Sequence, residues 1–166
     1  MYPNFKGWMK MIRYPKILLG SMLVLPFLSL PLIGKKSFKR FMPAGIFIIS
    51  IMAVVDFIAK KRRWWLIYEK IHPKVPGIIP FLSPFFIGSI WIMKWTYGKF
   101  LRFTLVNLLV DCLFIYVFVK FLTRSGIASI FGLKEKQVSL IFFIQSLMLY
   151  GFQYVKEKVT KRRFKF

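Results

Sequence analysis

Asp111 is the residue of this sequence whose type and position are most suited to chemistry. It lies at the centre of the uncharged run 103–119, with eight residues on each side. If this run spans a membrane, a carboxylate at its centre costs about 2.5–3.5 kcal/mol on insertion scales. We therefore expect Asp111 to face protein or a water-filled cavity, or to be protonated.

Three further polar side chains can be brought to the depth of Asp111. Asn107 lies one helical turn before it on the same helix face. Gln145 and Ser50 each lie near the centre of another uncharged run, so neighbouring helices would place them at the same level. Such a layer could be an ion or proton site, or it could join helices through hydrogen bonds worth about 0.6 kcal/mol each. Both interpretations are open at this point.

Five runs with almost no charge supply the helices that would position these residues. Each has 17 to 19 residues, and as a helix would span about 26 to 29 Å, close to the thickness of a bilayer's hydrocarbon core. Hydrophobic residues make up 57% of the 166-residue chain, too many for an ordinary soluble domain. The sequence therefore predicts an all-α fold, a polytopic transmembrane helical bundle that forms a single membrane domain over residues 1–166. The runs are 17–34, 41–59, 75–93, 103–119 and 137–155.

The third run is broken by prolines, which recur every four residues from Pro76 to Pro84. Ser83 followed by Pro84 is typical of a helix start, and Gly98 is typical of the position after a helix end. A helix from Pro84 to Tyr97 would span about 21 Å, too short to cross a membrane alone. The third run is therefore either a kinked crossing or a re-entrant piece.

Basic residues outnumber acidic residues by 27 to 5, and they lie in the segments between the apolar runs. If all five runs cross, the two faces carry 14 and 13 basic residues, and the positive-inside rule gives no orientation. If the third run does not cross, the faces carry 19 and 8, which places both termini in the cytoplasm. Insertion in both orientations is a further interpretation of the balanced count.

Two basic segments with aromatic residues adjoin the runs. One helical stripe of the segment 60–72 predicts a short helix lying in the lipid headgroup region. The stripe consists of Trp64, Ile67, Tyr68 and Ile71. The C-terminal tail 156–166 has a similar composition. Anionic lipid is the expected partner, attracted by about 1 kcal/mol per basic residue near the surface. The expected headgroup contacts are Lys60, Lys61, Arg62, Arg63, Trp64, Trp65, Arg162 and Arg163.

The sequence gives little support to an enzyme. With one histidine and one cysteine, a His-rich or thiolate metal site cannot form. Asp56 lies four residues before Lys60, so a local ion pair explains it, and it differs too much in depth from Asp111 for the two to share a proton. Metalloprotease, serine-hydrolase and phosphate-loop motifs do not occur. The basic residues are also spread over all the connecting segments, whereas nucleic-acid binding needs them on one face. We therefore expect no catalysis, cofactor, metal or nucleic acid.

One pattern of residues resembles a known group. The runs 61–65, 85–88 and 94–100, followed by Asn107 and Asp111, are similar to a pattern in uncharacterised small multi-pass membrane proteins of Gram-positive, spore-forming bacteria. This resemblance implies the bacterial plasma membrane and no mechanism.

These observations favour a non-enzymatic accessory or regulatory membrane component. We expect it to act through contacts with anionic lipid and with another membrane protein or a second copy of itself. The alternative is a small oligomeric transporter or channel that uses the polar layer around Asp111.

Overall fold

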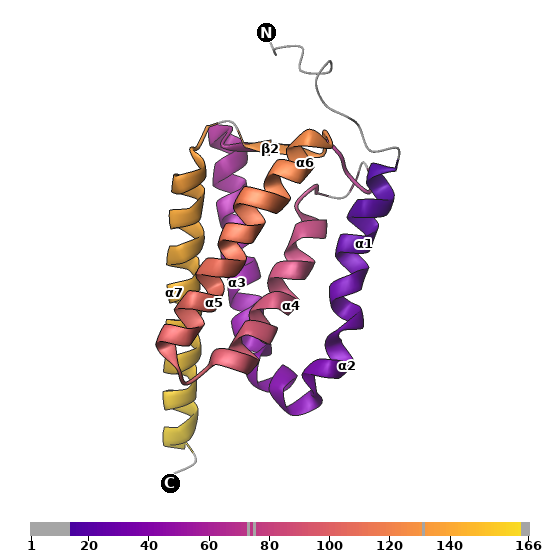
Figure 1. The fold of residues 1–166 in the computed structure, drawn as a ribbon. Coiled ribbons are helices and arrows are strands. Elements are labelled where there is room, and N and C mark those ends of the chain that lie inside the picture. The colour runs from indigo at the N-terminus through magenta and orange to yellow at the C-terminus, as the bar shows by residue number, and fades with distance from the viewer. Residues whose placement is uncertain (1–13, 73, 75, 131, 164–166) are drawn as a thin grey trace.

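The computed structural model describes residues 14–72, 74, 76–130 and 132–163, which form a bundle of long helices (Figure 1). Four helical stretches are long and apolar enough to cross a membrane: 15–33, 35–62, 100–124 and 135–160. The prediction of a mainly helical bundle, with helices long and apolar enough to span a membrane, is therefore confirmed. In chain order the elements are α1 (Pro15–Leu28), α2 (Leu30–Ile33), α3 (Lys35–Arg62), β1 (Trp65–Ile67), α4 (Ile79–Thr96), α5 (Phe100–Cys112), the π-helix η2 (Leu113–Val119), α6 (Lys120–Arg124), β2 (Ala128–Ile130) and α7 (Glu135–Arg163).

Helix α4, which is shorter than α3 and α7, packs along α1 and α3 and ends at the turn before α5 (Figure 1). Hydrogen bonds from its side chains to α1 and α2 show that α4 runs parallel to these two helices. Ser83 Oγ donates to the Leu23 carbonyl at 2.7 Å, and Lys94 Nζ donates to the Leu32 carbonyl at 2.9 Å. At its start, Gly77 lies against the side chain of Ile67 in β1. The two ends of α4 therefore lie at opposite ends of the bundle.

The prediction that this helix begins at Pro84 is wrong, because α4 begins at Ile79 and Pro84 lies inside it. Pro80 occupies the first turn, where a backbone donor has no partner within the helix and its loss costs little. The hydroxyl of Ser83 bonds to α1 and does not cap the helix. The predicted end is confirmed, since Gly98 follows the helix with a φ of 92°, in the region that favours glycine.

The prediction of a short helix in the segment 60–72 is also wrong. Helix α3 continues to Arg62, and Arg63 ends it with a φ of 55°. The chain then forms β1, which pairs antiparallel with β2 so that Trp65 faces Ile130 and Ile67 faces Ala128. Aromatic and β-branched residues fit a paired strand well, and here a partner from residues 128–130 provides the pairing.

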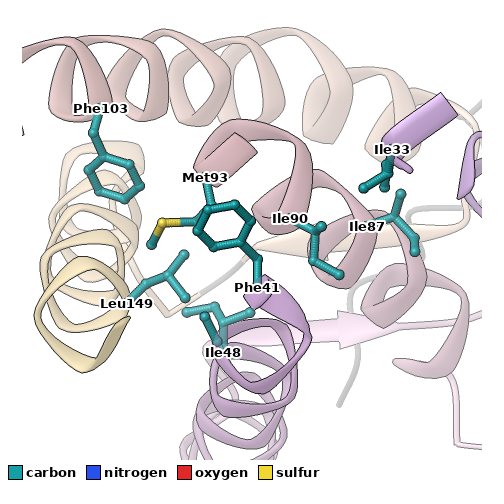
Figure 2. Close-up of a cluster of buried hydrophobic side chains, with 9 residues drawn as sticks. Ile33, Phe41, Ile48, Ile87, Ile90, Met93, Phe103 and Leu149 are labelled. Atoms are coloured by element: carbon teal, nitrogen blue, oxygen red, sulfur yellow. The ribbon is translucent and has the colours of Figure 1, made fainter. Parts of the chain in front are cut away.

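The main hydrophobic core joins α2, α3, α4, α5 and α7 (Figure 2). Phe103 of α5 and Leu149 of α7 lie on one side of Met93, and Phe41 and Ile48 of α3 lie near them (Figure 2). The core consists of Ile33, Phe41, Ala44, Ile48, Ile87, Ile90, Met93, Phe103 and Leu149.

Candidate functional site

The first candidate site is the layer of polar residues halfway along the bundle. Asp111 is the second-last residue of α5, and Asn107 lies one turn earlier on the same helix. Asn107 is buried, and its Nδ2 donates to the carbonyl of Phe103 at 2.9 Å. One donor group of Asn107 is thus used within its own helix.

Gln145 of α7 lies at the same level of the bundle as Asp111. The rings of Phe103 and Tyr150 meet 4.9 Å apart on one side of this level, and those of Phe114 and Phe142 meet 5.9 Å apart on the other. Helices α5 and α7 therefore run antiparallel, with Asp111 and Gln145 between the two ring pairs.

Both of these residues have a buried polar atom without a partner. Among the described residues, Asp111 Oδ2 and Gln145 Nε2 have no hydrogen-bond partner, although one is an acceptor and the other a donor. Leaving such an atom unpaired in an apolar interior costs about 1–3 kcal/mol, and more when the group is charged. Each of these two atoms is therefore open to a ligand or to a polar group of another chain, and the carboxylate also to a proton.

Ser50 does not join this layer, contrary to expectation. Its side chain is exposed on the outside of α3, and its hydroxyl donates to the carbonyl of Ile46 at 2.9 Å. A hydroxyl can satisfy itself within its own helix in this way, which leaves it free to face outward. The layer thus consists of Asp111, Asn107 and Gln145.

The backbone changes immediately after Asp111. Residues Leu113 to Val119 form the π-helix η2, in which the hydrogen bonds reach one residue further than in an α-helix. Such wide turns inside α-helices often occur at functional sites. Here η2 turns Phe114 and Val119 toward an apolar cavity.

This cavity of about 80 Å³ lies beneath the two strands, between α3, α4, α6 and α7. Its walls are apolar apart from Ser129 and the indole nitrogen of Trp65, and that nitrogen donates to Asp56 Oδ1 at 3.0 Å. Without polar groups aimed into it, the cavity can hold only an apolar group of a few atoms. Its lining residues are Met52, Trp65, Ile67, Ile78, Phe81, Phe85, Phe114, Val119, Leu122, Ala128, Ser129, Ile130, Val138 and Phe142.

Asp56 is held by two partners near the strands. The predicted ion pair with Lys60 is confirmed, and the bond from Trp65 satisfies the other carboxylate oxygen. Because both oxygens are bonded and the side chain is buried, Asp56 has a structural role at this end of the bundle.

A second polar cluster at the other end was not expected from the sequence. Arg40 of α3 bonds to Glu157 of α7 through both Nε and Nη2, at 2.6 and 2.8 Å. Gln153 Nε2 donates to Glu157 at 2.9 Å, and Lys156 Nζ donates to the carbonyl of Arg40 at 2.7 Å. Burial, helped by the charge of Glu157, raises the pKa of Tyr97 to about 12. The cluster joins α3 to α7, and Gln153 Oε1 within it has no hydrogen-bond partner.

The residues expected to contact lipid headgroups divide into three groups. Lys60, Lys61, Arg62 and Arg63 are exposed at the strand end of the bundle, whereas Trp64 and Trp65 are half-buried. Trp65 faces the cavity and Asp56, so it is a packing residue. The side chains of Arg162 and Arg163 lie outside the described part of the chain.

Within the described residues, no group of three or more histidine, cysteine, aspartate or glutamate side chains could hold a metal ion. No family model, curated protein or solved structure matches this chain. The half-depth layer of Asp111, Asn107 and Gln145 is therefore the best candidate for a functional site, judged by its geometry alone.

Proposed function

We propose that this chain is an integral protein of the bacterial plasma membrane that crosses the bilayer five times. We propose further that it is a non-enzymatic accessory or regulatory component, which acts through contacts with anionic lipid and with another membrane protein or a second copy of itself.

The observation that carries this proposal is an unbroken apolar ridge on the outside of α5, η2 and α6. Its six residues follow one another at intervals of four, and each is at least 44% exposed. Monomeric soluble proteins rarely expose an apolar patch of this length to water. Lipid tails or the helix of a partner would cover it. The ridge consists of Leu101, Leu105, Leu109, Leu113, Val117 and Phe121.

The ends of the bundle support the lipid part of the proposal. Exposed lysine and arginine side chains lie beside aromatic rings at both ends, as with Arg62 over Trp64 and Lys158 over Tyr154. Aromatic rings favour the depth of the membrane interface, and basic groups favour anionic headgroups. We therefore propose that the protein acts through its outer surface, by contacts with lipid and with partner helices.

Part of this proposal can be tested with the purified chain in vesicles. An accessory component should conduct neither protons nor monovalent cations, so pH- and cation-sensitive dyes inside the vesicles should record the same leak with and without the protein.

The alternative is a small oligomeric transporter or channel, and a specific observation favours it. The unpartnered Asp111 Oδ2 and Gln145 Nε2 lie at the depth where a transported ion would be bound. The transporter or channel replaces the accessory role if the wild-type protein conducts ions and Asp111→Asn abolishes this flux. The control variant Thr104→Val, on the same helix, should then preserve the flux. Equal flux in wild type and Asp111→Asn would remove Asp111 from any transport path.

A further inference from the structure

The orientation of a helical membrane protein depends on the difference in basic residues between its two faces. In this chain α4 joins the two ends of the bundle, because it begins beside Ile67 of β1 and reaches Leu32 of α2. With α4 as a crossing, the number of crossings is odd and the termini lie on opposite faces. This step rests on the five crossings of the proposed function.

The basic residues then divide almost equally between the two faces. In the sequence, the segments 1–16, 60–74 and 120–136 adjoin the helix ends on the strand side, and together they carry 14 lysine and arginine residues. The segments 35–40, 94–102 and 156–166 adjoin the helix ends on the other side in the sequence, and they carry 13. All these segments are short and lie close to the helix ends, where basic residues count toward orientation.

Other features of the two ends are also alike. Cations lie over aromatic rings at the strand end, where Lys120 is 5.8 Å from the Tyr116 ring centre, and at the opposite end, where Lys94 is 4.9 Å from that of Trp91. Each end has a buried or half-buried carboxylate paired with a base, Asp56 at one end and Glu157 at the other. Among the described residues, these features do not distinguish one end of the bundle from the other.

We infer that the chain inserts into its membrane in both orientations, so that each face is cytoplasmic in a comparable share of the molecules. Asp111 and Gln145 lie halfway along the bundle, so in a second copy of opposite orientation they would lie at the same membrane depth as in the first copy. Residues near the ends of the bundle would instead lie on opposite sides of the membrane in the two copies.

Labelling of single cysteines in intact cells tests this inference. In a Cys112→Ser background, His72→Cys reports on the strand end and Thr160→Cys on the opposite end. Both native side chains are exposed, and neither change alters the count of lysine and arginine. A membrane-impermeant maleimide should label about half of the molecules at each position, relative to the total labelled after permeabilisation.

The possible outcomes are distinct. Full labelling at one position and none at the other would overturn the dual orientation and leave the five crossings intact. The same result at both positions, either complete labelling or none, would overturn the five crossings as well. A cytoplasmic protein with an accessible cysteine serves as the control for intact cells.

A matched pair of charge variants makes the test sharper. Changing Lys61, Lys70 and Lys74 to glutamine should move the strand end outside, so that labelling at position 72 approaches completion and labelling at 160 falls. Changing Lys35, Lys36 and Lys39 should give the opposite shift. All six side chains are exposed, and no ion pair described for this chain includes them. If about half of the molecules are labelled in the wild type and neither triple variant changes this fraction, the charge balance does not set the orientation. That result would contradict the inference.

Discussion

At the scale of single residues, polar contacts at the two ends of the bundle fix the helices. The bidentate pair of Arg40 and Glu157 links α3 to α7, and charge-assisted bonds of this kind are stronger than single ones. The pair of Lys120 and Glu135 is longer, at 3.5 Å, and both side chains are about half exposed. The two pairs should therefore differ in their contribution to stability.

We expect Glu157→Gln to lower the free energy of unfolding by about 1–3 kcal/mol, because it removes an ion pair and weakens a bond from the buried Gln153. Glu135→Gln should change it by less than about 1 kcal/mol. Unfolding of the purified variants in mild detergent, followed by circular dichroism, measures both. Equal effects of the two changes would contradict the ranking.

Asp111→Asn should leave the stability unchanged or raise it by about 1 kcal/mol, because the substitution keeps the shape and removes an uncompensated acid. The same unfolding assay measures this effect. A loss of 2 kcal/mol or more would mean that Asp111 is bonded to a partner within the folded chain.

Local residue contacts could be predicted from the sequence, but contacts between distant segments could not. The pair of Asp56 and Lys60 follows from a spacing of four residues on one helix. Arg40 and Glu157 are separated by 117 positions, and no local pattern connects them. Ser50 was misplaced because its position along α3 indicated its depth but not the side of the helix that it occupies.

At the scale of helices and strands, the contact between α3 and α4 depends on a small residue. A Cβ atom at Gly45 would lie 2.7 Å from Phe86 Cε2 and 3.3 Å from Ile90 Cγ1. At Gly88, also within a helix, a Cβ would meet nothing within 4 Å. The ring of Phe86 therefore packs directly on Gly45, and a side chain is excluded at position 45 but not at position 88.

We expect Gly45→Ala to be less stable than Gly88→Ala by about 1–3 kcal/mol. The first change overpacks a helix contact, while the second gains helix propensity without a clash. Thermal unfolding of the two variants in the same detergent compares them. If both variants are equally stable, Phe86 can move aside and the contact is not tight.

The positions of the helices could be predicted more accurately than their ends. The runs of 17 to 19 apolar residues correspond to the helices, but α3 and α7 continue into the basic segments beyond them. A basic side chain at a helix end favours continuation into the interface, which composition alone does not show. The segment 60–72 was predicted as a helix because its strand partner, residues 128–130, lies far away in the sequence.

At the scale of the whole molecule, the bundle is an apolar belt with basic ends. The ridge on α5, η2 and α6 is continued around the bundle by exposed apolar residues of α7 such as Leu140, Ile144 and Val155. In water this surface would drive association, and in a bilayer it is the surface that lipid covers. The cost of burying Asp111, the orientation of the chain and its contacts with lipid all depend on this environment.

Extraction of the native chain from its membranes tests that environment most directly. We predict that the chain stays in the membrane pellet after washing with alkaline carbonate, and that only detergent releases it as a uniform species. A chain that carbonate releases, and that remains monodisperse in buffer without detergent, would contradict the central claim.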